Sequence, residues 1–529
     1  MEKPTDVVKP FGGLSRRRLL GLTGGFVGAG LLGGCQISTE TDPSGASGGG
    51  GQDAKLKLPD SGARIPDRDI EFQWMDSGDL KGLFHKPLFE AYQQKHPNVT
   101  IDYQDSSWDT INESIPLAVR NKRAPDVFQL PENVPVQTAV NERWIRPIDE
   151  LVPDFEQWKG RFGEDMFLEG VHVFDGKTYT WPLTASKRLS KMVMFDPEYL
   201  RRADVDPIAE RFTWTSFRQA CKKITRQGDG DYYGLMAAGD AMAGIAINLA
   251  RLAGMRCLDE ATPFDFRTGE YVANSPELVA AFELLLQLKS DGSFFPGFLG
   301  LGDADSRARM PNRVAGMIFD GPWDIPEWQA TNPDYEFDIA LPPYGDDEKT
   351  HCLGYQENGV NFMYVSVNTE NEAVVGDLFA YMGSVEGQTQ MVLLSEGNLT
   401  SVIPAANEAA DEQRDELDPL AVKAIAYADE LMRIAPKVES RNPDISMVQL
   451  QMDPVSPTLT EIGEGVVSGK ITDIGRALRD FDDQAERNLD RAIEAARKQG
   501  AKISRDDWVF PNWDPSKDYT PDDYEALAK

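Results

Sequence analysis

The 529-residue chain has 86 acidic and 54 basic residues, a formal net charge of −32, and a hydrophobic content of 41%. This apolar content excludes a wholly disordered chain, and the length allows two or three domains. The acidic surplus argues against nucleic acid or anionic lipid as an electrostatic partner, because both need clustered basic residues. Since the surplus is spread along the chain, it favours a halophilic protein whose surface charges are screened by salt.

Residues 1–34 have the pattern of an export signal. Arg16 and Arg17 precede an apolar stretch of 14 residues from Leu19 to Leu32, shorter than the roughly 20 residues that span a bilayer. The paired arginines resemble a twin-arginine signal, with a Sec signal as the alternative. The stretch ends in Leu-Gly-Gly-Cys at Cys35. That ending resembles a lipobox, so we expect lipidation at Cys35 and an anchored, extracellular protein.

Residues 35–68 contain runs of glycine and serine, which behave as a flexible coil. We expect this segment to tether the anchor to a folded body that begins near residue 69.

Apolar spacing then predicts alternating strands and helices. The first elements expected are a strand at Ile70–Trp74, a helix at Leu80–Tyr92, a strand at Val99–Tyr103, a helix at Asp109–Arg120 and a strand at Pro125–Leu130. Later strands are expected at Met192–Phe195, Ala315–Phe319, Phe337–Leu341 and Phe362–Val367, and a long helix at Asp473–Lys498. This alternation predicts parallel β-α-β units and an α/β fold.

An ordered series of short motifs follows the same segments. The series comprises Phe89-Glu90-Ala91-Tyr92 leading to His96-Pro97-Asn98-Val99, Ala124-Pro125-Asp126-Val127-Phe128, Gly176 to Pro182, Thr213-Trp214-Thr215-Ser216-Phe217, and Ala315 to Trp323. Together these motifs resemble the extracellular solute-binding protein family 1, which includes maltose-binding and other sugar-binding proteins. The resemblance covers residues 69–500, and residues 501–529 form an extension without an assigned function.

The resemblance implies a two-lobed, periplasmic-binding-protein-like α/β fold with a hinge cleft. It implies a first lobe of residues 69–184 and 361–400 and a second lobe of residues 185–360 and 401–500. Crossovers are expected near Pro182–Leu189, Gly354–Asn361 and Asn398–Pro404. It also implies a permease and an ATPase of an ABC importer as membrane partners.

Aromatic and polar residues recur where the expected strands end. A sugar presents apolar faces and hydroxyls, so its site needs aromatic planes with amides and carboxylates. The predicted ligand contacts are Trp323, Trp181, Trp74, Asp76, Asp105, Trp108, Gln129, Tyr179, Asp320, Tyr355 and Asn358. Trp323 stands at the ligand-stacking position of the family, and Trp181 or Trp74 is expected on another side of the ligand.

Two other functions compete with sugar binding. A phosphorylated or anionic solute would need basic groups, for which Lys187 and Arg188 are the candidates. A glycoside-active enzyme would need two carboxylates, such as Asp320 with Asp324 or Asp76 with Asp105. The tether and the motif order favour a binding protein without enzymatic activity. The scattered cysteines and histidines predict neither a metal site nor a cofactor.

Overall fold

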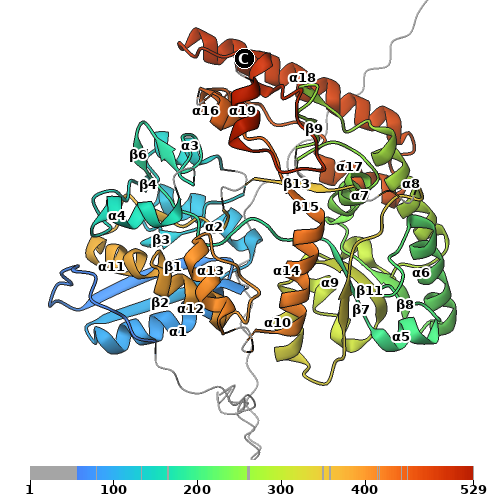
Figure 1. The fold of residues 1–529 in the computed structure, drawn as a ribbon, viewed down its shortest axis with the longest axis horizontal. Coiled ribbons are helices and arrows are strands. Elements are labelled where there is room, and N and C mark those ends of the chain that lie inside the picture. The colour runs from blue at the N-terminus through green and yellow to red at the C-terminus, as the bar shows by residue number, and fades with distance from the viewer. Residues whose placement is uncertain are drawn as a thin grey trace, which may run out of the picture. The chain divides into compact units, whose positions relative to one another are not determined.

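The computed structural model describes residues 56–527, except 79, 133, 164–165, 259–261, 348, 350, 357–358, 414, 416, 443 and 450. The export signal, Cys35 and the part of the tether up to residue 55 lie outside the described residues, as does Asn358. Two lobes, each built on one mixed sheet, account for most of the described chain (Figure 1).

The first lobe is built on a five-stranded sheet with the order β2-β1-β3-β14-β4. Its strands are β1 (Ile70–Asp76), β2 (Val99–Asp105), β3 (Val127–Phe128), β4 (Ile145–Arg146) and β14 (Tyr364–Ser366). The helices of this lobe are α1 (Leu80–Lys95), α2 (Trp108–Arg120), α3 (Val136–Asn141), α4 (Phe155–Lys159), α11 (Glu372–Met382), α12 (Val385–Leu394) and α13 (Pro404–Asp411). A hairpin of β5 (Val173–Phe174) and β6 (Lys177–Thr178) is attached to it through the bond from Ile148 N to Thr178 O.

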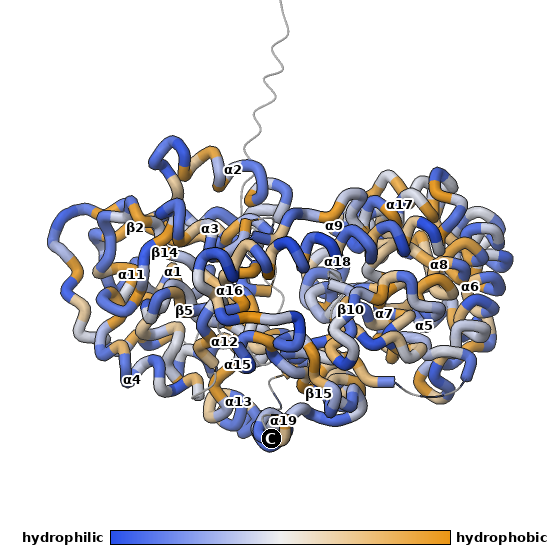
Figure 2. The backbone as a smooth tube through the Cα atoms, turned by 90° about the horizontal axis from the view of Figure 1, so that it is seen from above, coloured by the Kyte–Doolittle hydropathy of each residue, from blue (hydrophilic) through white to orange (hydrophobic). Residues whose placement is uncertain are grey.

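The second lobe is built on a four-stranded sheet with the order β12-β7-β11-β8. Its strands are β7 (Met192–Phe195), β8 (Tyr233–Met236), β11 (Ala315–Asp320) and β12 (Asp338–Ala340). Its helices are α5 (Pro197–Arg202), α6 (Trp214–Gly228), α7 (Met242–Leu252), α8 (Pro276–Ser290), α9 (Asp303–Arg307), α10 (Asp324–Thr331), α14 (Pro419–Leu431), α17 (Leu459–Ser468) and α18 (Ile474–Lys498). Figure 2 shows α1 and α11 on one side and α6 and α8 on the other.

A smaller region joins the second lobe near the C-terminus. It contains the pairs β9 (Phe264–Asp265) with β10 (Glu270–Tyr271) and β13 (Leu353–Tyr355) with β15 (Met432–Ile434). The short helices α15 (Val438–Arg441), α16 (Ile445–Gln449) and α19 (Pro521–Leu527) complete it.

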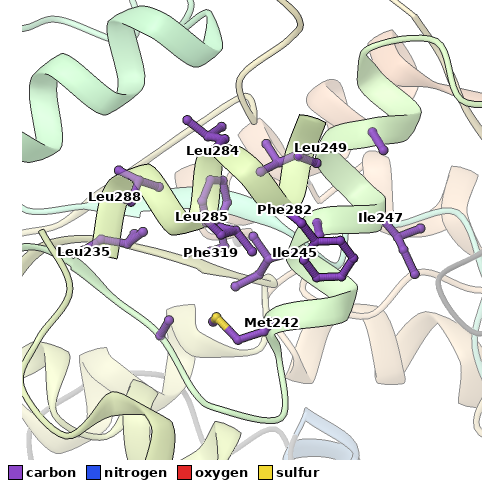
Figure 3. Packing of buried hydrophobic residues seen from close by; sticks show 14 of the residues in the cluster. Leu235, Met242, Ile245, Ile247, Leu249, Phe282, Leu284, Leu285, Leu288 and Phe319 are labelled. Carbon is purple, nitrogen blue, oxygen red and sulfur yellow. The ribbon is translucent and has the colours of Figure 1, made fainter. Parts of the chain in front are cut away.

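Each of the two lobes has its own hydrophobic core. In the first lobe, β1 buries alternate residues against α1 and α11, so that Phe72, Trp74 and Phe379 are fully buried. In the second lobe, α7 and α8 pack their leucines and isoleucines against β8 and β11 (Figure 3). Each core is large enough to fold as a unit, which fits two bodies joined by a hinge.

The predicted elements are confirmed within a few residues at their ends. Met192–Phe195 is a strand over the predicted range, and the long C-terminal helix begins one residue later than predicted. The predicted parallel pairing is present between β1 and β2, β1 and β3, and β8 and β11, but both sheets are mixed, because β14 runs antiparallel to β3 and β4, and β7 runs antiparallel to β11 and β12. The chain passes through the second lobe before it returns to form β14. This strand is therefore not part of a β-α-β unit, and its direction is not tied to that of β1, β2 and β3.

The three expected crossover segments are hydrogen-bonded to one another. Thr184 and Val360 exchange backbone bonds of 3.3 and 2.8 Å, and Ala185 N donates to Thr400 O at 2.9 Å. Beyond them, α13 still packs on α12, and Ala406 and Ala410 belong to the first core. The chain therefore stays with the first lobe past residue 400 and joins the second lobe again at α14.

Candidate functional site

A cleft of about 650 Å³ lies between the lobes. The first lobe and the crossovers contribute Ser77, Leu80, Lys81, Ser107, Trp108, Asp109, Glu132, Asn361 and Leu399 to its lining. Arg188, Asp240, Gly302, Asp303, Ala304, Asp305, Arg307 and Trp323 line it from the second lobe and its crossover. The volume falls within the range of small-molecule sites, which is about 300–1,000 Å³.

Two tryptophans line this cleft from opposite lobes. Trp108 is the first residue of α2, where Ser107 caps the helix by accepting from Thr110 N at 3.2 Å. Trp323 lies between β11 and α10, and the Arg188 guanidinium is 5.4 Å from the centre of its ring. Both rings therefore belong to the lining of the same cleft.

The local chain fixes the position of Trp323. A Cβ at Gly321 would lie 2.3 Å from the indole ring, so only glycine leaves room for the ring to fold back over its own turn. The buried Nε1 of Trp323 has no hydrogen-bond partner. The ring is thus held in place by packing and retains a donor.

On the first-lobe wall, Asp76 is the centre of a buried hydrogen-bond network. It is 0% exposed and accepts from Trp74 Nε1 at 2.8 Å, Tyr103 OH at 2.9 Å and Gly78 N at 2.7 Å. His85 Nδ1 lies 2.8 Å from its Oδ2. Burial alone would raise the pKa of Asp76, but His85, Lys81 and the Gly78 amide outweigh it and lower the pKa to about 2. Asp76 therefore remains ionised and organises the turn after β1.

This turn presents Ser77 and Lys81 to the cleft. Gln129 Oε1 accepts from Ser77 N at 2.8 Å, and Lys81 Nζ donates to Ser77 Oγ at 2.7 Å. Gln129 and Asp76 are both buried and do not line the cleft, so in this structure they act by positioning residues that do.

On the second-lobe wall, two buried carboxyls lack the donors that Asp76 has. Asp320 ends β11, and its Oδ1 accepts from Gly321 N at 2.8 Å, while its Oδ2 has no partner. Both oxygens of Asp324, the first residue of α10, also lack a partner. Burial raises the pKa of Asp320 to about 7 against the opposing effect of Lys191, and burial together with Asp320 raises the pKa of Asp324 well above its usual range. The pair therefore holds a proton at neutral pH.

Charged groups of both signs line the cleft. The carboxylates are Asp109, Glu132, Asp240, Asp303 and Asp305, and the basic groups are Lys81, Arg188 and Arg307. Arg307 is engaged within the wall, since its Nη1 lies 3.4 Å from Asp303 and its Nε lies 3.1 Å from Glu327. The lining can accept and donate hydrogen bonds, as a polyhydroxylated ligand requires.

The structure brings only part of the predicted site to the cleft. Trp323 and Trp108 line it, but Trp74 and Trp181 are each 0% exposed in the first core, where Trp181 contacts Trp158, Phe162 and Phe379. Both rings pack rather than face a ligand, because the strand end and the crossover that carry them turn inward.

The other predicted contacts lie outside the lining. Asp105 is exposed and pairs with Lys86 at 3.2 Å, Tyr179 packs edge-on against Phe174, and Tyr355 lies in β13 with Lys187 Nζ 6.0 Å from its ring. Asp320 is buried behind the wall.

Several lining residues escaped the sequence analysis. Ser77 follows Asp76 directly and Lys81 lies in the first turn of α1, so both are close in sequence to the strand end that the analysis pointed to. Asp303 and Asp305 were not among the predicted contacts, and Arg307 follows them in the same short helix. Their place at the cleft depends on tertiary packing, which no local pattern in this chain reveals.

Among the described residues, no cluster of histidine, cysteine, aspartate or glutamate could hold a metal ion. Within the same part of the chain, no helix has the length and apolar composition needed to cross a bilayer.

Comparisons with known proteins extend this picture. Residues 77–389 match the family model described as bacterial extracellular solute-binding protein. A search of curated proteins gave no match.

Solved structures share the fold. An ABC transporter solute-binding protein from Thermotoga lettingae TMO, bound with alpha-D-tagatose, is 17% identical with a TM-score of 0.58, covering 80% of this chain and 100% of that one. Maltose-bound MalE3 of T. maritima is 15% identical with a TM-score of 0.56, covering 79% and 99%. UgpB from Mycobacterium tuberculosis, in complex with glycerophosphocholine, is 14% identical with a TM-score of 0.56, covering 80% and 99%. At these identities the similarity confirms the two-lobed α/β fold.

Proposed function

The chain belongs to the bacterial extracellular solute-binding protein family, and from this premise we propose that it captures a sugar or oligosaccharide between its lobes for an ABC importer. The observation that carries the proposal is the pair of tryptophans, Trp108 and Trp323, on opposite walls of one cleft. Flat rings stack on the apolar faces of a sugar, while nearby carboxylates and Ser77 bind its hydroxyls. Neighbours with bound tagatose and maltose support a sugar as ligand.

A phosphorylated solute is the second candidate, because Lys81 and Arg188 line the cleft and one neighbour binds glycerophosphocholine. Carboxylates outnumber basic groups in the lining, which opposes a strongly anionic ligand. A thermal-shift screen of sugars, polyols and glycerol phosphates in molar salt distinguishes the two. Ligand at a hundredfold excess over Kd should stabilise the protein by about 2.7 kcal/mol. If only the phosphates do so, the sugar proposal fails.

Catalysis is not part of the proposal, because the family consists of binding proteins and Asp320 and Asp324 are buried behind the cleft wall. Incubation with oligosaccharides should release no new reducing ends, and their appearance would make the protein a glycoside-active enzyme.

The proposal includes a lipid anchor at Cys35 on the outer face of the cell membrane. Cys35→Ser should then release the protein from the membrane fraction, and a variant that still sediments with membranes would contradict the anchor. Changing Arg16 and Arg17 to lysine should leave precursor in the cytoplasm if export follows the twin-arginine route.

The proposal also includes adaptation to high salt. Removing residues 1–34 changes the net charge from −32 to −35. The Debye length grows from about 3 Å at 1 M salt to about 30 Å at 0.01 M, so repulsion should lower the melting temperature in dilute salt. Equal melting temperatures at the two concentrations would reject this part of the proposal.

A further inference from the structure

A contact between the lobes lies outside the cleft and the hinge. Gly170, in the loop before β5, has a φ of +82°, and a Cβ added to it would lie 2.8 Å from Cβ of Ser446 in α16. The two residues therefore touch with no room for a methyl group between them. Neither residue lines the cleft, and Figure 2 shows α16 close to β5.

The first-lobe side of this contact is held firmly. Gly170 N donates to Val173 O at 2.8 Å, and Leu168 N donates to His172 Nδ1 at 3.2 Å. His172 is buried, and its ring packs edge-on against Phe362 at 5.1 Å. The loop is thus tied to the body of the lobe and cannot yield easily.

The second-lobe side is held by residues 501–527, which follow α18. Lys502 N donates to Asp444 Oδ2 at 2.7 Å, and Asn442 Nδ2 donates to Lys502 O at 3.0 Å. Further along, Tyr524 OH accepts from Lys437 N at 2.7 Å. These bonds connect the residue before α15 and the loop between α15 and α16 to the C-terminal extension.

An apolar cluster reinforces these bonds. Val438, Ile445 and Val448 pack with Trp508 and with Leu489 of α18 in one buried cluster. Since α18 also contributes to the main second-lobe core through Leu478, Phe481 and Ala485, α16 is fixed to that lobe. Figure 1 shows α16 and α19 lying together beyond the ends of both sheets.

We propose that α16, braced by the C-terminal extension, is a clasp that holds the two lobes together in the absence of ligand. An opening motion that moves α16 away from the loop before β5 breaks the contact between Gly170 and Ser446. The contact is small, but open and closed states of such proteins differ by only a few kcal/mol. This role gives the extension a conformational function, and it does not depend on what the cleft binds.

Gly170→Ala tests the clasp by placing a methyl group in the contact. Gly176→Ala is the matched control, because Gly176 also has a positive φ, +70°, but no atom lies within 4 Å of its added Cβ. Both variants carry similar backbone strain in the same hairpin region. Only in Gly170→Ala does the added methyl group press against another residue, Ser446. We expect small-angle scattering of ligand-free protein to give a larger radius of gyration for Gly170→Ala alone.

Hydrogen exchange gives a second readout on the same proteins. Amides of residues 437–449 should exchange on the order of tenfold faster in Gly170→Ala, equivalent to about 1.4 kcal/mol, and at the original rate in Gly176→Ala. Equal radii and equal exchange in the two variants would overturn the proposal.

Ser446→Leu keeps the test valid if Gly170→Ala fails to fold. This substitution enlarges the side chain at residue 446 in α16, where the backbone is helical and the change adds no backbone strain. The clasp predicts the same expansion and the same faster exchange. An unchanged radius for a folded Ser446→Leu protein would show that the lobes do not depend on this contact.

Discussion

The two walls of the cleft shift the pKa of a buried carboxyl in opposite directions. On the first lobe, Asp76 follows β1 and is surrounded by donors from Trp74, Tyr103, His85 and Gly78, and its pKa falls to about 2. On the second lobe, Asp320 and Asp324 flank Trp323 with three carboxyl oxygens unpartnered, and their pKa values rise.

This difference shows that donors, and not burial alone, decide the charge of a buried acid. The first wall is a rigid, ionised network that fixes the turn carrying Ser77 and Lys81. The second wall keeps a proton next to Trp323, so its charge depends on pH near neutrality.

The largest effect is expected from Asp76→Ala. The change leaves Trp74 Nε1, Tyr103 OH and the buried His85 side chain without their acceptor, and several buried groups left unsatisfied at about 1–3 kcal/mol each sum to about 3–5 kcal/mol. Chemical denaturation at neutral pH should show a loss of this size. A loss below about 1 kcal/mol would mean that the network is not a structural centre.

Trp74→Ala and Trp323→Ala compare the aromatic residues of the two walls. Trp74 is fully buried, so its truncation should cost about 3–5 kcal/mol of unfolding free energy. Trp323 is partly exposed at the cleft, so the same change should leave ligand-free stability much less affected. Thermal melts of both variants test this, and equal losses would make Trp323 a core residue.

Asp324→Asn is expected to raise the free energy of unfolding, by less than the preceding changes lower it. The folded protein binds more protons than the unfolded chain between about pH 4 and pH 7, because folding raises the carboxyl pKa values. Stability should therefore fall as pH rises through this window.

The amide of Asp324→Asn carries no charge, so the variant should lose part of this slope. At pH 8 it should be more stable than the original protein, because above its unfolded pKa a carboxyl with a raised folded pKa destabilises the fold, whereas an amide does not titrate. Parallel slopes in denaturation series from pH 4 to 8 would show that Asp324 is not protonated. The charged groups facing the pair are Lys191, Asp303, Arg307 and Glu327.

Much of the fold could be predicted because apolar periodicity reports local burial. The alternation in Ile70–Trp74 and the stripe in the long C-terminal helix were both sufficient to define their elements. The direction of β14 and the continuation of the first lobe through α13 were not predictable, because both depend on how the chain returns between lobes.

The site was predicted less well than the fold. Strand ends indicated the correct region, and Trp323 and Trp108 do line the cleft. Trp74 and Trp181 were expected on another side of the ligand, but both rings are fully buried in the first core, and local sequence does not distinguish such a ring from one at the cleft. Arg307 and Asp303 reach the cleft only through the packing of α9 on the second lobe.

Titration calorimetry of Trp323→Ala, with a sugar identified by the thermal-shift screen, tests the central claim most directly. Stacking on an indole should contribute about 1–2 kcal/mol, by analogy with aromatic pairs and buried area. We therefore expect about tenfold weaker binding, with ligand-free stability nearly unchanged. Unchanged affinity together with a large drop in melting temperature would contradict a ligand site at Trp323.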